Sequence, residues 1–200
     1  MTKPEQPEVY LARHGETAWS RSGQHTGRTD IPLTEQGERE ARALGERLRG
    51  PTFDRAWTSP LARASRTADL AGFAGLARSD PDLVEWGYGD YEGLRTAEIH
   101  ARNPGWLLLR DGAPGGESVE AVGDRADRVI ARLREAGGRT LVIGHGHFTR
   151  VLAARWLGLP VAGARLLLLG TAALSIVSYD HGRDEPVIRL WNDDRHLQGG

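Results

Sequence analysis

The chain has 200 residues, and its 26 lysines and arginines balance 27 acidic residues, for a formal net charge of −1. This length is typical of a single domain, and the charge balance excludes the strongly basic surface of a protein that coats nucleic acid. The absence of cysteine excludes disulfides, thiol catalysis and cysteine-based zinc sites. Residues 1–7 lack the apolar core of a signal peptide, and the longest apolar stretch, 161–169, is too short to span a bilayer. We therefore expect one cytoplasmic domain over residues 1–200, with no nucleic-acid or membrane partner.

Short apolar runs predict the strands of the fold. In chain order they lie at residues 9–12, 55–58, 140–143, 173–179 and 187–191. The run at 140–143 is continuously apolar, which is typical of a strand buried on both faces. The run at 173–179 fits either the interior of a sheet or an edge that pairs with a second copy, so the sequence leaves a homodimer open.

Helical periodicity and capping residues fill the intervals between these runs. Thr34 is placed to cap one helix, and Ser59 followed by Pro60 to start the next. Ser118 precedes a longer helix whose apolar residues recur at three- and four-residue steps, and 148–157 is predicted as another helix. The alternation of strands and helices predicts an α/β fold, a three-layer αβα sandwich with a mainly parallel central sheet.

Two segments depart from this pattern. Residues 80–116 are rich in glycine and aromatic side chains and poor in periodicity, which predicts an irregular insert that serves as a lid or binding wall. Residues 193–200 are predicted to form a loose tail.

Histidine-bearing turns follow the first and the central predicted strands. Arg13 and His14 end the first strand, and His145 and His147 follow the central one. Because the carboxyl ends of parallel strands share one edge of the sheet, both turns are expected to meet in one crevice. Arg63 lies in the first turn of a helix, where a cation is unfavourable unless it faces an anion. A guanidinium suits phosphate oxygens and a neutral imidazole is a nucleophile, so the pattern favours phosphate chemistry.

Simpler interpretations compete with this one. A histidine in a turn is more often a hydrogen-bonded polar residue than a catalyst, and histidines such as His25 are interpreted in that way, although the loop of His25 is within reach of the site. His145 and His147 would also suit a metal ion, but a zinc site needs three or four ligands. No phosphate-binding loop of the Walker type occurs in the chain.

A series of short motifs runs through nearly the whole chain. They lie at residues 11–17, 22–27, 30–37, 58–64, 85–93, 115–118 and 144–147. In these motifs and their order the chain resembles the histidine phosphatase superfamily, in the branch that includes cofactor-dependent phosphoglycerate mutases. The resemblance implies a phosphoglycerate mutase-like fold and a phosphohistidine intermediate.

The resemblance also implies a role for each matching residue. His14 is the nucleophile, and Glu85 is the acid that protonates the leaving group. Arg13, Arg63 and a protonated His145, the third catalytic residue, hold the phosphate dianion. The other predicted phosphate- and substrate-binding residues are Ser20, Thr26, Gly27, Tyr88, Gly146 and His147. His14 must be neutral, with its second ring nitrogen donating to an acceptor such as a backbone carbonyl. Since cationic side chains supply the electrostatic stabilisation, neither a metal nor a cofactor is expected.

Departures from the mutase pattern favour water as the phosphoryl acceptor. Mutases of this family carry an arginine directly after the acid and a lysine further on, whereas this chain has Trp86, which would make the wall less polar, and then Arg95. The insert holds only Arg102 and Arg110, far apart, in place of a paired-arginine segment. We therefore expect a phosphatase of the acid phosphatase type that hydrolyses small phosphorylated metabolites.

Other functions stay open at the level of the sequence. A sugar-bisphosphate phosphatase would hold a second phosphate with Arg21, Arg28, Arg95 or Arg102, and a phosphoglycerate mutase would return the phosphoryl group to its substrate. A catalytically silent module that binds phosphorylated ligands would tolerate loss of the nucleophile or the acid, and both are present. A metal hydrolase built on the histidines would be inactivated by a chelator.

Overall fold

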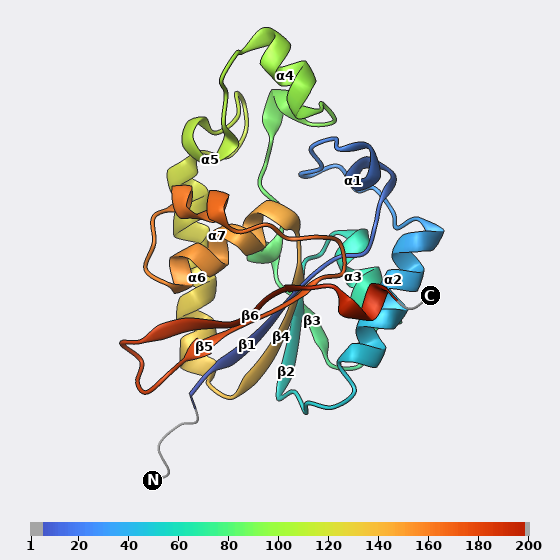
Figure 1. Cartoon of the computed structure of the whole chain (residues 1–200), viewed down its shortest axis with the longest axis vertical. Helices are drawn as coiled ribbons and strands as arrows, with labels where there is room; N and C mark the ends of the chain where they lie inside the picture. The colour runs from blue at the N-terminus through green and yellow to red at the C-terminus, as the bar shows by residue number, and fades with distance from the viewer. Residues whose placement is uncertain (1–5, 199–200) are drawn as a thin grey trace.

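The computed structural model describes residues 6–198 of the chain. Within them, six strands form one sheet in the order β3-β2-β4-β1-β5-β6 (Figure 1). The strands are β1 (Glu8–Arg13), β2 (Arg55–Thr58), β3 (Ala77–Ser79), β4 (Arg139–Gly144), β5 (Leu174–Tyr179) and β6 (Pro186–Asp193). The first four run parallel, and β5 and β6 are antiparallel to their neighbours, so the predicted mainly parallel sheet is confirmed.

Helices cover both faces of this sheet. They are α1 (Ala18–Ser22), α2 (Glu35–Arg47), α3 (Ala62–Leu70), α4 (Thr96–Arg102), α5 (Leu108–Asp111), α6 (Val119–Ala136) and α7 (Gly146–Trp156). Figure 1 shows α6 and α7 on one side of the strands and α2 and α3 on the other. Successive residues of a strand point to opposite faces, so Leu11 packs with the core under α6 and α7, and Ala12 with the core under α2 and α3. The predicted αβα sandwich is thereby confirmed.

The structure adds one strand to the prediction and shows which of two open positions another strand takes. β3 was not predicted, because its residues are mostly polar or half-buried and form no apolar run. β5 pairs with β1 on one side and with β6 on the other, so it lies in the interior of the sheet. The edges of the sheet are therefore β3 and β6.

Side-chain caps start the two longest helices as the sequence predicts. The Thr34 hydroxyl accepts a hydrogen bond from the backbone N–H of Gly37 at 3.0 Å. The Ser118 hydroxyl accepts one from Ala121 at 3.1 Å. Each cap satisfies one of the N–H groups that have no partner within the first turn of the helix.

The predicted start of α3 at Ser59 and Pro60 is wrong. Ser59 continues the direction of β2, because its backbone N–H donates to the carbonyl of Ile143 at 3.2 Å. The helix begins only at Ala62, whose N–H donates to the Asp30 carboxylate at 2.9 Å. The cap of this helix thus comes from a loop that is distant in the sequence, and local sequence signals could not show it.

The insert and the tail are more ordered than the sequence suggests. Residues 80–116 contain α4, α5 and two short 3-10 turns, Pro81–Leu83 and Gly89–Tyr91, and two residues of this insert, Glu85 and Tyr88, line a cavity. The tail is not loose up to residue 198, since Asp193 forms an ion pair with Arg47 at 3.1 Å and His196 donates to the carbonyl of Ala172 at 3.0 Å. Residues 199–200, and residues 1–5 of the segment that lacks a signal-peptide core, lie outside the described residues.

The register of the sheet brings three strand ends to one level. Arg13 of β1 lies opposite Gly144 of β4, and Thr58 of β2 lies opposite Ile143 of β4. The residues that follow these strands therefore leave the sheet side by side, as predicted for the crevice. Figure 1 shows α1 and α4 beyond this edge. Among residues 6–198, no helix combines the length and the apolar character that crossing a bilayer requires.

Candidate active site

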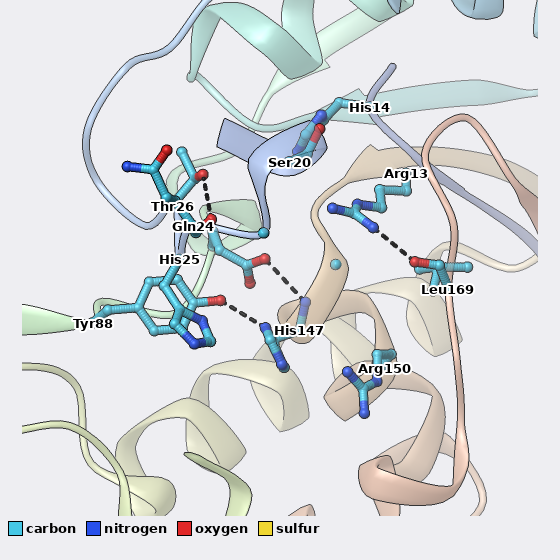
Figure 2. Close-up of a pocket in the computed structure, with 13 residues that line it drawn as sticks. Arg13, His14, Ser20, Gln24, His25, Thr26, Tyr88, His147, Arg150 and Leu169 are labelled. Atoms are coloured by element: carbon cyan, nitrogen blue, oxygen red, sulfur yellow. Dashed lines mark hydrogen bonds between the residues drawn. The ribbon is translucent and has the colours of Figure 1, made fainter. Parts of the chain in front are cut away.

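A cavity of about 180 Å³ opens at this edge of the sheet (Figure 2). The predicted site residues that line it are Arg13, His14, Ser20, Thr26, Glu85, Tyr88, Gly146 and His147. Arg63, His145 and Gly27 are buried and lie outside this lining. Most of the predicted site residues therefore line one cavity, and the other three are buried outside its lining.

His14 is held as a neutral imidazole with one ring nitrogen left for reaction. It is 4% exposed, and its Nδ1 donates to the carbonyl of Gly15 at 2.7 Å, as the sequence analysis expected. A carbonyl can only accept, so Nδ1 carries the hydrogen and Nε2 keeps its lone pair. Burial, with Arg13 and Arg63 nearby, lowers the pKa of His14 well below its usual value of 6.5. Gly15 fits here because a Cβ atom would collide with the backbone of Gly37.

His145 is also neutral, which corrects the expectation that it is protonated. Its Nδ1 accepts a hydrogen bond from Nε of Arg63 at 3.2 Å, so Nε2 carries the hydrogen. Burial and the adjacent Arg63 guanidinium lower its pKa well below 6.5. The buried Nε2–H has no hydrogen-bond partner, and the ring lies 5.2 Å from that of His14. His145 therefore offers a hydrogen-bond donor, rather than a full charge, beside the nucleophile.

Arg63 is fully buried and is held mainly by protein groups. In addition to its bond with His145, it donates to the carbonyls of Thr26 at 3.3 Å, Gly27 at 2.8 Å and Thr29 at 2.9 Å. These four bonds occupy four of the five N–H groups of a guanidinium. Glu92 fixes the same loop by accepting from Gly27 N–H at 2.8 Å. These bonds leave one N–H group of Arg63 unused.

This bonding pattern predicts that Arg63 supports folding as well as catalysis. Arg63→Met is expected to lower the free energy of unfolding by about 3 kcal/mol, because buried carbonyls lose a charged donor. It is expected to lower kcat/KM as well. Urea unfolding and hydrolysis of p-nitrophenyl phosphate measure the two effects.

Arg66 provides the matched control for this variant. It lies on the same helix and forms an ion pair with Glu38 at 3.0 Å on the surface. Arg66→Met is expected to change the free energy of unfolding by at most about 1 kcal/mol. A stability loss for Arg63→Met that is no larger than this would contradict the supporting role.

Glu85 is anchored by backbone donors. Its Oε1 accepts from the N–H groups of Trp86 at 2.9 Å and Phe148 at 2.8 Å, and its Oε2 accepts from His147 at 3.0 Å. The last two donors belong to the first turn of α7, which begins at Gly146 rather than at residue 148 as predicted. A helix N-terminus attracts a carboxylate, so α7 fixes Glu85 at the wall of the cavity.

Trp86 lies in the core and does not line the cavity, which corrects its expected place in the wall. It is fully buried, and its indole N–H donates to the carbonyl of Glu117 at 2.8 Å. Glu117 in turn forms a buried ion pair with Arg125 at 2.6 Å. Arg125 also donates to the carbonyl of Val84 at 2.7 Å. Glu117 and Arg125 therefore hold in place the segment that carries Glu85.

Several residues of the cavity lining were not predicted. They are Gly23, Gln24, Arg150 and Leu169. His25, whose loop the sequence placed within reach of the site, also lines the cavity. Arg150 follows Gly146 by four residues, so helical spacing was a signal that could have found it. Leu169 contributes its backbone carbonyl, which accepts from Arg13 at 2.8 Å (Figure 2). No sequence pattern marks such a backbone contact.

Potential metal ligands do not cluster at this cavity. Within the described part of the chain, a group of three such ligands occurs only at Asp180, His181 and Glu185. β5 starts near His14, because the backbone N–H of Ala172 donates to the carbonyl of His14. The three exposed residues follow the other end of β5, so they lie at the end of the sheet away from the cavity. The charged groups on the cavity lining are instead Arg13, Arg150 and Glu85.

The family to which this fold and site belong is clear from comparison with known proteins. A model of the histidine phosphatase superfamily (branch 1) matches residues 9–194. The chain belongs to this superfamily, as its motifs suggested.

Individual relatives agree with this assignment. The chain is 41% identical to an acid phosphatase of Mycobacterium tuberculosis, over 96% of this chain and 97% of the relative. It is 37% identical to sedoheptulose 1,7-bisphosphatase of Saccharomyces cerevisiae, over 78% of this chain and 69% of the relative. A solved structure of an open-reading-frame product of Mycobacterium tuberculosis superposes with a TM-score of 0.89 at 38% identity, covering 94% of this chain and 97% of the other.

Proposed function

We propose that the chain is a metal-independent phosphomonoesterase of the acid phosphatase type, which hydrolyses small phosphorylated metabolites through a phosphohistidine at His14. One observation carries the proposal. Two buried donors without a partner, Nε of Arg13 and Nε2 of His145, accompany an imidazole nitrogen of His14 that is free to attack. Unpaired buried donors are costly, so this arrangement indicates an anionic ligand held beside a nucleophile. The acid phosphatase and bisphosphatase names of the relatives support hydrolysis of phosphoric monoesters.

The proposed reaction has two steps. Nε2 of His14 attacks phosphorus, the bond to the leaving oxygen breaks, and Glu85 protonates that oxygen. Water then attacks the phosphohistidine, Glu85 takes its proton, and the N–P bond breaks to release orthophosphate. Arg13, the remaining donor of Arg63 and Nε2–H of His145 hold the oxygens that do not react.

The surface arginines support hydrolysis over a mutase reaction. Arg95 is exposed and paired with Glu98 at 3.0 Å, and Arg110 is exposed and paired with Asp111 at 2.7 Å. Neither these arginines nor Arg102 lines the cavity. A second phosphate is therefore not retained by the residues that would serve a mutase, and water is the acceptor of the phosphoryl group.

We propose further that residues 1–200 act as one domain in the cytoplasm.

Hydrolysis of p-nitrophenyl phosphate in the presence of a chelator, over a pH series on both sides of 6.5, tests this function. The lowered pKa of His14 means that the neutral nucleophile persists as the pH falls through 6.5. We therefore expect kcat/KM to be maintained below pH 6.5 and to be insensitive to the chelator. Inactivation by the chelator would favour a metal hydrolase, and binding of phosphate esters without turnover would favour a silent module.

A further inference from the structure

One part of the cavity takes no part in the proposed chemistry. It is lined by His25, Tyr88, His147 and Arg150. Figure 2 shows Arg150 on the same helix as His147, on the side of the cavity away from His14. These residues are therefore placed to contact the leaving group of a phosphate ester bound at His14.

Among residues 6–198, no carboxylate forms an ion pair with the Arg150 guanidinium. Its Nε and Nη2 both donate to one carbonyl, that of Ala164, at 3.2 and 3.1 Å, and these bonds leave Nη1 unused. The ion pairs found within residues 6–198 do not include Arg150, although Arg155 on the same helix pairs with Asp127 at 2.6 Å. A half-buried cation without a counter-ion is unfavourable. Its position on a cavity wall points to an anion that comes from a ligand.

The one carboxylate on the cavity lining, that of Glu85, forms no ion pair with Arg150, although its charge partly offsets the lowering of the Arg150 pKa by burial. The Tyr88 hydroxyl and Nδ1 of His147 share a hydrogen bond of 2.7 Å. Burial raises the pKa of Tyr88 and lowers that of His147, so both side chains are neutral. Glu85 is the carboxylate of the lining, and it is tied to backbone N–H groups. With a phosphate held by Arg13, Arg150 is left as a second cation.

The other arginines considered for a second anion lie elsewhere. Arg21, Arg28, Arg95 and Arg102 are exposed, and none of them lines the cavity. Arg150 therefore replaces them as the residue that a second anionic group of a substrate would meet.

We propose that Arg150 binds an anionic group on the leaving group, a carboxylate or a second phosphate, and so makes small anionic phosphomonoesters the preferred substrates. This proposal rests on the phosphatase function proposed above. A planar guanidinium can bind either anion with two parallel hydrogen bonds.

Two matched substrate pairs test the proposal. Glycerol 3-phosphate and 3-phosphoglycerate differ only in a hydroxymethyl group that is replaced by a carboxylate. Fructose 6-phosphate and fructose 1,6-bisphosphate differ only in the second phosphate. We expect the wild-type protein to prefer the more anionic member of at least one pair, and Arg150→Gln to lower that preference by about 10- to 100-fold, mainly through KM. Arg150→Lys is expected to restore part of it, and the affected pair identifies the anion.

Arg102→Gln is the matched control, because it removes one positive charge from the surface outside the cavity. It is expected to leave the substrate preference unchanged. Equal losses on both members of each pair in Arg150→Gln, or no preference in the wild-type protein, would overturn the assignment of Arg150. Failure of the wild-type protein to hydrolyse any of these esters or p-nitrophenyl phosphate would instead overturn the phosphatase function itself.

Discussion

His14→Ala is expected to abolish turnover, with kcat lowered by at least about 10⁴-fold, as for removal of the nucleophile in other enzymes that use covalent catalysis. The same variant is expected to trap no labelled phosphate when it is mixed with a radiolabelled phosphoester and quenched in alkali. The physical reason is that His145, the other histidine beside His14, cannot replace it as a nucleophile. The ring nitrogen of His145 that carries the lone pair, Nδ1, already accepts a hydrogen bond from Arg63. Acid-labile label on the wild-type chain and its absence from the variant form the measurement.

A control separates chemistry from folding in this experiment. His181 is exposed in the turn between β5 and β6, so His181→Ala is expected to label and turn over as the wild-type protein does. Thermal unfolding of both variants shows whether the folded state is kept. Labelling that persists in folded His14→Ala would refute His14 as the nucleophile.

Glu85→Gln is expected to lower kcat for alkyl phosphates by about 10²- to 10⁴-fold, the usual contribution of a general acid. The effect on p-nitrophenyl phosphate is expected to be much smaller in the first step, because nitrophenolate leaves without needing a proton. A rapid burst of nitrophenol followed by slow turnover is therefore expected, since hydrolysis of the phosphohistidine still needs a base. Stopped-flow absorbance measures the burst and the steady rate separately.

Glu120 on α6 is exposed and serves as the control position, so Glu120→Gln is expected to behave as the wild-type protein. Glu85 also accepts three backbone hydrogen bonds, and the amide of the variant can accept only part of them. Urea unfolding measures this structural cost. Equal losses in the rate of the first step for alkyl and nitrophenyl esters would show that Glu85 positions α7 and does not transfer the proton to the leaving group.

The sequence predicts the parts of this molecule that depend on periodicity and short motifs. The central strand at 140–143, the capped helix after Ser118 and the turns that bear His14 and His145 were all placed correctly. These features follow from local apolar spacing and capping chemistry. The convergence of the two turns follows because a parallel sheet aligns its carboxyl ends.

Contacts between distant segments explain what the sequence did not predict. The true cap of α3 is Asp30, from another loop, and the partners of Arg63 are backbone carbonyls that any residue type supplies. The neutral state of His145 depends on burial beside Arg63, and burial is a property of the assembled fold. The carbonyl partners of Arg63 come from residues 26–29, a segment that the sequence did not connect with this helix.

The two orphaned donors at the site, Nε of Arg13 and Nε2 of His145, have a consequence for the resting protein. A cavity that leaves such groups unsatisfied when empty gains stability from the first tetrahedral oxyanion that enters it. Orthophosphate is one such anion, and it is also what the reaction releases. The same features that prepare the protein for its substrate therefore make its product a competitor, so that turnover slows as phosphate accumulates.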